Sequence, residues 1–402
     1  MKLLELNASP QAAKTSAIFI SILAALMAFT SLSTDIYLPA MPQMAKDLQG
    51  DAELTITGFL IGFAIAQLIW GPISDRFGRK PPLFIGLVLF AIGSAGCALS
   101  TEIHQIVLWR VFQAVGACVG PMLARAMIRD LFSHVEAAHK LSTLTIIMAI
   151  APIIGPLFGG QIIRFSSWHS IFWLLSIIGL LMLFAIYLIP ETLPLDRRSS
   201  ASLVRAMKNY GWLLKQRSFV TNALCVCFFY IAAYAFITGS PFVYIDYFGV
   251  DPQHYGWLFA VNIVGVMLLS FVNRRLVHKF ALKSLLTGAT VVAALAAIVL
   301  MLLVALSLAN MWLVVMCIFV FFSMNGIIAA CATAAALAKM SHIAGSASAL
   351  IGAMQYGSGI VSSLLLALFL DGTPWTMSWI IALFTVLSML MARAAPAVDA
   401  AE

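Results

Sequence analysis

Twelve stretches of this chain consist almost entirely of apolar residues, and each is long enough to cross a lipid bilayer as a helix. Hydrophobic residues fill 62% of the 402 positions and charged residues 10%, which is more apolar surface than a soluble core can bury. The sequence therefore predicts an all-α membrane protein with twelve transmembrane helices in a lipid bilayer. The predicted spans are residues 17–40, 54–73, 82–100, 105–127, 141–163, 168–189, 219–245, 255–273, 285–306, 311–337, 344–369 and 375–393.

Basic residues gather in alternate links between these spans. With the N-terminus placed in the cytoplasm, nineteen of the 23 lysines and arginines fall in cytoplasmic segments, and only Lys46 and Arg164 fall in external links. This asymmetry follows the positive-inside rule, so both termini are predicted to be cytoplasmic. The net charge of +7 is explained by these loops, and no nucleic-acid partner is expected.

The link between the sixth and seventh spans is longer and more polar than the others. It carries six basic residues between Arg197 and Arg217. A layout of six and six spans around such a link is typical of two related helix bundles that enclose a central site. We therefore predict an N-terminal six-helix bundle at residues 1–190, a cytoplasmic central loop at 191–218 and a C-terminal six-helix bundle at 219–402.

The link between the second and third spans reads Gly71-Pro-Ile-Ser-Asp75-Arg76-Phe-Gly78-Arg79-Lys80. A tight turn requires a glycine such as Gly78, and adjacent acidic and basic side chains can form ion pairs or cap a neighbouring helix. Taken alone, the basic residues also fit an ordinary cytoplasmic loop with a turn.

The whole string resembles the inner-loop signature of the major facilitator superfamily. The resemblance implies that the loop latches the two bundles together on the cytoplasmic side. In that arrangement Asp75 is expected near the N-terminus of the eleventh span, and Arg79 is expected to pair with Asp130. The implied latch residues are Gly71, Asp75, Arg76, Gly78, Arg79 and Asp130.

The fourth span contains an arginine in the string Arg110-Val-Phe-Gln113-Ala-Val-Gly116. Arginine does not lose its charge, so its burial requires a partner or a wet cavity. Arg110 and Gln113 are three residues apart and share one helix face. The alternative is that Arg110 snorkels to the outer surface near Glu102. The string resembles the fourth-helix signature of the same superfamily.

The fifth span contains the string Gly155-Pro156-Leu-Phe-Gly159-Gly160. Proline interrupts the hydrogen-bond ladder of a helix, and glycine lets a neighbouring helix approach closely. The alternative is generic helix packing. The string resembles the G-P-x-x-G-G signature of drug–proton antiporters, which implies export rather than uptake.

Asp35, near the end of the first span, is the acidic residue that lies most clearly within a span of the first half. A membrane carboxylate is expensive unless it is paired or protonated. Burial favours the neutral acid and a nearby cation such as Arg110 favours the carboxylate, and these opposed effects suit a group that loads and releases protons. All seven histidines fall in links or at span ends. Asp35 and Arg110 are therefore the predicted proton-coupling residues; the alternative is an aspartate that merely faces water at the outer interface.

A substrate cavity requires a few polar groups among apolar walls. Polar and aromatic residues within the spans supply candidates in both halves, although each alone fits a helix–helix hydrogen bond equally well. The predicted cavity residues are Tyr37, Gln113, Tyr230, Tyr234, Asn262, Asn325 and Gln355.

Further strings along almost the whole chain resemble the Bcr/CflA (bicyclomycin-resistance) family of drug–proton antiporters. Among them are Asp35-Ile-Tyr-Leu-Pro-Ala, Glu191-Thr-Leu-Pro and Ser240-Pro-Phe-Val-Tyr244. The resemblance implies the major facilitator fold and a proton-coupled antiporter that exports small hydrophobic drugs, such as bicyclomycin or chloramphenicol, across the bacterial inner membrane. The alternative with the same fold is a transporter of a metabolite such as a purine or an amino acid.

Other classes of protein are less compatible with the sequence. No G-x-x-x-x-G-K-[ST] string is present, so ATP is not the evident energy source. Cys225 and Cys227 have no second pair with metal-ligand spacing, and the chain lacks the several polar catalytic residues that a membrane enzyme needs at one depth. We predict no metal, no cofactor and no enzymatic activity. A channel usually forms its pathway from several subunits, whereas here the two six-span halves of one chain can form a pathway. A monomer is therefore expected.

Overall fold

The computed structural model describes residues 17–198, 203–340, 343–369 and 371–396. Within these ranges the regular elements are all helical, and twelve segments are long and apolar enough to cross a membrane. The predicted fold class and the predicted number of spans are both confirmed.

The first six spans are built from six long helices and two short elements. They are α3 (Ala17–Asp35) with η1 (Leu38–Ala40) and α4 (Met41–Leu48), then α5 (Glu53–Phe77), α6 (Lys80–Leu99), α7 (Ile103–Leu131), α8 (His134–Phe165) and α9 (Trp168–Tyr187).

The central link contains the short turn η2 (Leu195–Arg197) and the polar helix α10 (Leu203–Leu213). The last six spans are α11 (Arg217–Pro241) with η3 (Phe242–Tyr247), α12 (Pro252–Leu276), α13 (Leu282–Ala305), α14 (Met311–Ser323) with α15 (Asn325–Leu337), α16 (Ala344–Leu368) and α17 (Trp375–Ala394).

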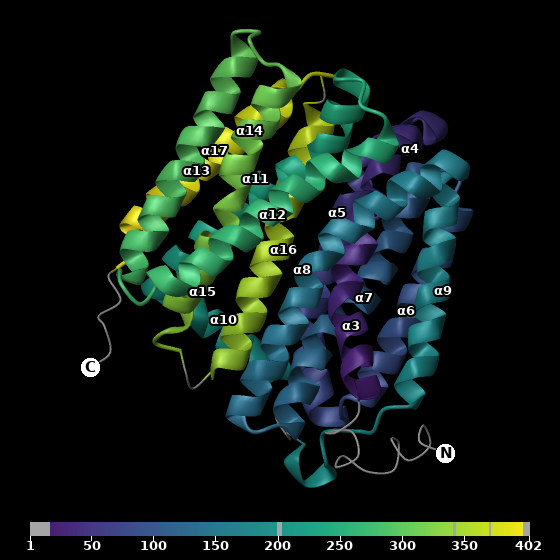
Figure 1. Ribbon diagram of the computed structural model, residues 1–402. Coiled ribbons are helices and arrows are strands. Elements are labelled where there is room, and N and C mark those ends of the chain that lie inside the picture. The colour runs from purple at the N-terminus through teal and green to yellow at the C-terminus, as the bar shows by residue number, and fades with distance from the viewer. Residues whose placement is uncertain (1–16, 199–202, 341–342, 370, 397–402) are drawn as a thin grey trace. The chain divides into compact units, whose positions relative to one another are not determined.

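The chain divides into two compact units, and Figure 1 colours them in sequence order from purple to yellow. In the described part, the first unit comprises the residues up to Gly50 and those from Gly58 to Ala206. The second unit begins at Met207 and also includes the segment Asp51–Thr57 at the start of α5.

In the first unit, α3 packs against α7 and α8, and α6 packs against α7 and α9. Side-chain donors reach backbone carbonyl groups on neighbouring helices. The Thr30 hydroxyl donates to the Ala117 carbonyl (3.0 Å), and the Ser176 hydroxyl donates to the Ala91 carbonyl (2.9 Å). In lipid such bonds help to hold helices together, because no hydrophobic force favours helix contacts over lipid contacts.

In the second unit, α11 is the central helix and packs against α15, α16 and α17. The Ser388 hydroxyl on α17 donates to the Cys225 carbonyl on α11 (2.8 Å). The Phe229 ring of α11 lies 5.3 Å, centroid to centroid, from that of Phe321 on α14.

The first span is interrupted immediately after Asp35. Pro39 lacks a backbone N–H, so the α-helical ladder cannot continue through it, and a 3-10 turn separates α3 from α4. Residues 35–40, which we name the Asp35 break, are all buried. The sequence therefore places an acidic residue where a membrane helix is broken, and broken helices in transporters form ion and substrate sites.

Candidate functional site

Asp35 is the last residue of α3, and its side chain is only 7% exposed. Its Oδ1 accepts a hydrogen bond from the Thr34 hydroxyl (2.9 Å), and the Arg110 charge acts on it electrostatically. The alternative interpretation of the sequence required Asp35 to face water at the outer interface. The burial of Asp35 is inconsistent with that alternative.

The fifth-span motif lies directly against the Asp35 break. Gly155, Pro156, Gly159 and Gly160 of α8 are all buried. A Cβ atom added to Gly155 would lie 3.3 Å from the Asp35 Cβ atom, and one added to Gly159 would overlap the carbonyl oxygen of Ile36. Glycine is therefore required at position 159 for α8 to reach the backbone that follows the acid.

Arg110 of α7 is fully buried, so it does not snorkel to the surface. Its Nη1 donates to the Ser33 carbonyl (3.0 Å) and to Gln113 Oε1 (2.5 Å). The guanidinium carbon lies 4.4 Å from the ring centroids of both Tyr37 and Phe59. Carbonyl oxygens and aromatic faces thus help to stabilise the cation, which is an effective arrangement where water is excluded.

Two of the predicted cavity residues belong to the surroundings of Arg110. Gln113 accepts from Arg110, and its Nε2 donates to the Ser94 hydroxyl (2.7 Å). Tyr37 lies under the guanidinium and packs against the Phe172 ring, with 5.6 Å between ring centroids. Both side chains are fully buried and orient Arg110, and their role in substrate binding stays a prediction.

The second unit brings four of its five predicted cavity residues together. Tyr230 and Tyr234 of α11 have ring centroids 6.3 Å apart, and the side-chain amides of Asn325 and Gln355 interact with the Tyr230 hydroxyl. Tyr356, which the sequence analysis did not select, places its ring centroid 6.5 Å from that of Tyr234. We name the five residues the tyrosine cluster; Tyr230, Tyr234, Asn325, Gln355 and Tyr356 come from α11, α15 and α16.

Asn262, the fifth candidate of the second unit, is not joined to the tyrosine cluster by any contact described here. It is fully buried in α12, and its Nδ2 donates to the Leu258 carbonyl of the same helix (2.9 Å). This bond fits a structural role in the helix.

A second polar group surrounds Arg79, between α5 and α6. Its Nε and Nη2 donate to the two carboxylate oxygens of Asp130 (2.8 and 3.2 Å). Its Nη1 donates to Asp75 Oδ1 (2.7 Å) and to the Ser74 hydroxyl (2.8 Å). The predicted pairing of Arg79 with Asp130 is confirmed. We name Ser74, Asp75, Arg79 and Asp130, together with Thr192, which donates to Asp130 (3.1 Å), the Arg79 cluster.

Burial opposes the positive charge of Arg79, but the hydrogen bonds and charges of Asp130 and Asp75 outweigh it and raise the pKa of Arg79 above its ordinary value. The favourable contribution of a raised pKa is present at every pH below the ordinary value. Arg79 therefore stays charged throughout the physiological range.

Glu191 closes the turn before α6, and the sequence analysis did not select it as a site residue. Its carboxylate accepts from the backbone N–H groups of Arg79 (2.9 Å), Lys80 (3.0 Å) and Leu193 (3.0 Å). Gly78 has a φ of +98°, and a Cβ atom there would lie 2.6 Å from Glu191 Oε2. No local pattern predicts this contact, because more than 110 residues separate Glu191 from Arg79.

Two further predicted latch residues, Arg76 and Gly71, form no hydrogen bond or ion pair with Arg79 among the described residues. Arg76 is exposed, and its guanidinium carbon lies 5.4 Å from the Phe77 ring centroid. A Cβ atom added to Gly71 would meet no atom within 4 Å. Neither residue is held by the packing around Arg79.

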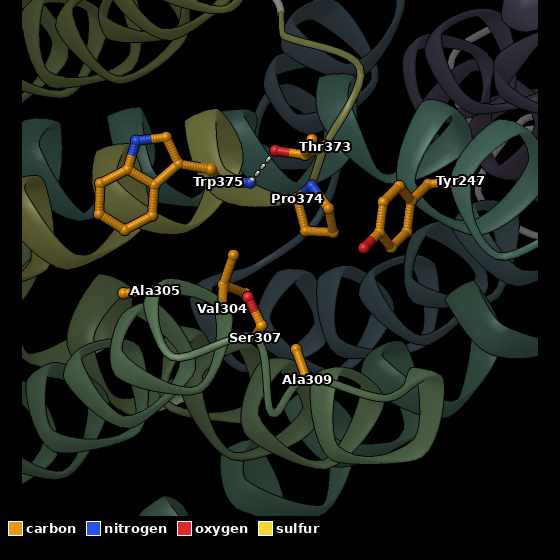
Figure 2. Close-up of a pocket in the computed structure, with 8 residues that line it drawn as sticks. All are labelled: Tyr247, Val304, Ala305, Ser307, Ala309, Thr373, Pro374 and Trp375. Carbon is orange, nitrogen blue, oxygen red and sulfur yellow. Dashed lines mark hydrogen bonds between the residues drawn. The ribbon is translucent and has the colours of Figure 1, made fainter.

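The structure also contains a cavity of about 410 Å³ in the second unit, away from all predicted site residues. Figure 2 shows its walls, which come from the ends of η3, α13 and α17 and the links beside them. The Tyr247 and Ser307 side chains extend toward the open space, whereas Thr373 is bonded to the Trp375 backbone N–H (3.1 Å). None of the described residues that line this cavity carries a charge.

Comparisons with known proteins agree with this architecture. The model of the Major Facilitator Superfamily matches residues 23–363. The chain is 39% identical over 341 residues to an uncharacterized MFS-type transporter, YdgK, of Bacillus subtilis, which covers 83% of this chain and 84% of that protein. It is 32% identical over 384 residues to a bicyclomycin resistance protein homolog of Haemophilus influenzae, with 94% and 96% covered.

The fold is similar to the solved structure of the xylose transporter XylE from E. coli in a partially occluded inward-open conformation. The TM-score is 0.74 with 16% sequence identity, and the match covers 96% of this chain and 100% of that chain. At this identity the likeness extends to the fold alone.

Proposed function

The chain belongs to the Major Facilitator Superfamily, and on that basis we propose that it is a proton-coupled antiporter that exports small hydrophobic drugs. It is a multi-pass membrane transporter and not an enzyme. The name of the Haemophilus relative, a bicyclomycin resistance protein homolog, supports drug export for this chain. We place the protein in the bacterial inner membrane as a monomer with both termini in the cytoplasm, as the distribution of basic residues favours.

The observation that carries the proposal is the contact between Asp35 and the fifth-span motif. Asp35 is a buried acid at a helix break, and Gly155 and Gly159 bring α8 against the same backbone. A proton that binds Asp35 removes a negative charge from this contact and from the field of Arg110. The packing of α3 against α8 therefore responds to protonation, which links the proton to a movement of helices.

In each transport cycle, the Asp35 side chain changes once from the carboxylate to the neutral acid and back. A proton from outside binds the Asp35 carboxylate, and the transporter then opens toward the other side of the membrane, as alternating access requires. The proton leaves on the cytoplasmic side, and drug moves outward. Arg110 keeps its charge throughout, so it stabilises Asp35 each time the carboxylate re-forms.

The tyrosine cluster provides the proposed substrate contacts. Three aromatic faces suit a hydrophobic molecule, and the amides of Asn325 and Gln355 offer a few hydrogen bonds that orient it. The Asn325 Oδ1 atom is buried and has no hydrogen-bond partner among the described residues, so it is available to a donor on the substrate.

We propose that the Arg79 cluster acts as the cytoplasmic latch. Arg79 and the Glu191 carboxylate fix the turn between α5 and α6, which holds the Asp75 side chain beside the start of α6. Asp75 itself remains 55% exposed and is free to interact with a further group.

The test measures drug efflux and proton flux in vesicles that contain the purified protein. An imposed pH gradient, acidic on the side of proton entry, should drive drug transport by the wild type. Asp35→Asn should abolish both fluxes while the protein remains folded, and Glu102→Gln, at an exposed acid, should leave them unchanged. Unchanged fluxes in Asp35→Asn would refute the proposed role of Asp35. Transport of purines or amino acids but not of drugs would favour the metabolite transporter.

A further inference from the structure

Glu53, the first residue of α5, is a buried acid that the transport mechanism described above does not use. Its residue surface is 1% exposed, and its Oε2 atom has no hydrogen-bond partner among the described residues.

Two partly buried acids among the described residues have their oxygens occupied. Both Asp130 oxygens accept from Arg79, and the Glu191 carboxylate accepts from three backbone N–H groups. For Glu53, the hydrogen bond that acts on the carboxyl group comes from its own backbone. A helix N-terminus favours a carboxylate through its free N–H groups, yet here one oxygen remains without a donor.

The segment around Glu53 leaves little room for compensating water. Ala52, Thr55 and Ile56 are all buried, and the Thr55 hydroxyl donates to the Ala52 carbonyl (2.6 Å). A carboxylate in such a place is costly, whereas a neutral carboxylic acid is not.

Among the described residues, the charged group that acts on Glu53 has the same sign and supplies no counter-ion. Asp51, two residues earlier, is exposed and repels a negative charge on Glu53. The acid and the histidine at the start of α7, Glu102 and His104, are both exposed to solvent.

We propose that Glu53 is a second proton-binding site, neutral in the conformation described here and ionised when the start of α5 opens to water. One O–H bond forms as the proton binds and the same bond breaks as it leaves, so no other reactant is needed. The inference rests on the proposed proton-coupled export for its role in transport. A cycle that uses both Asp35 and Glu53 carries one more proton per drug than a cycle that uses Asp35 alone.

The first experiment counts protons. In vesicles, the drug gradient that exactly balances an imposed pH gradient gives the number of protons exchanged per drug. We expect Glu53→Gln to keep exchange active but to lower this number by one, and Glu102→Gln to match the wild type. An unchanged number in Glu53→Gln overturns the proposal.

A second experiment observes the proton directly and does not depend on transport. In infrared spectra of the protein in lipid at neutral pH, the difference between wild type and Glu53→Gln should contain the carbonyl stretch of a protonated carboxylic acid. The spectrum of Asp35→Asn should still contain this band, because Glu53 is unchanged in that variant. Its absence from the Glu53→Gln difference overturns the inference. A wild type that shows this band but no proton-driven flux refutes the proposed function and leaves Glu53 as a protonated acid.

Discussion

The first unit buries two arginines, and it stabilises them in different ways. Arg79 pairs with two carboxylates, and the neighbouring Glu191 carboxylate caps the turn on which it stands. Arg110 is bound by a carbonyl oxygen, an amide oxygen and two aromatic rings, with Asp35 acting on it through its charge.

The difference supports the proposed roles, in which the Arg79 cluster is fixed and Asp35 changes its charge. Full pairing around Arg79 makes any change of protonation costly, because it leaves a buried charge uncompensated. The surroundings of Arg110 are largely neutral, so Asp35 can gain or lose a proton without disrupting an ion pair at every step. In the proposed mechanism, a static turn and a proton site thus coexist in one unit.

The largest effect is expected from removing Arg110. In Arg110→Ala the Ser33 carbonyl and the Gln113 amide lose their donor in a buried place, and we expect a loss of transport of roughly 100-fold, equivalent to about 3 kcal/mol. Drug efflux in vesicles measures it. Arg125→Ala is the matched control, because Arg125 lies on the same helix but is exposed. Equal and mild effects of the two changes would contradict a functional role for the buried Arg110.

The next largest effect is expected at Gly159. A methyl group there overlaps the Ile36 carbonyl oxygen, so Gly159→Ala should push α8 away from the Asp35 break and reduce transport about tenfold, since overpacking costs about 1–3 kcal/mol. Gly71→Ala adds the same methyl group to open space and should have little effect. If both variants transport at the wild-type rate, the contact between the motif and the acid is not part of the mechanism.

A smaller effect on transport, but a clear one on stability, is expected at Arg79. Arg79→Ala leaves Asp130 without its partner, and we expect a loss of about 2 kcal/mol, reduced from the value for a fully buried pair because Asp75 is half exposed. Thermal unfolding in detergent measures the loss. Arg79→Lys should recover part of the lost stability, since lysine restores the charge but not the bidentate hydrogen bond to Asp130. Arg76→Ala, at an exposed neighbour, should unfold at the wild-type temperature.

The smallest effect is expected in the tyrosine cluster. Tyr230→Phe removes one hydroxyl that interacts with Asn325 and Gln355, and the KM for drug should rise about fivefold, equivalent to about 1 kcal/mol. Maximal velocity should be unchanged, because the aromatic face remains. A matching increase in KM for Asn262→Ala, outside the cluster, would indicate a general packing effect and not substrate binding.

The spans, the basic loops and the motif strings could be read from the sequence, because each depends on residues close together in the chain. The Arg79–Asp130 pair was predicted through the family resemblance, and the composition of that loop alone left other interpretations open. Glu191 could not be identified in this way, since its partners are defined only when the end of α9 returns to the turn before α6. Glu53 was missed for a different reason: an acid in the first turn of a helix is ordinary, and only burial reveals the oxygen without a partner.

Two close contacts with the end of α3 and the Asp35 break are made to backbone carbonyl groups. Arg110 binds the carbonyl of Ser33, and Gly159 lies against the carbonyl of Ile36. Every amino acid has a carbonyl group, so mutation at positions 33 and 36 leaves these acceptors in place, whereas mutation at 110 or 159 removes the interaction. Substitutions at positions 33 and 36 are therefore expected to be tolerated better during evolution than substitutions at positions 110 and 159.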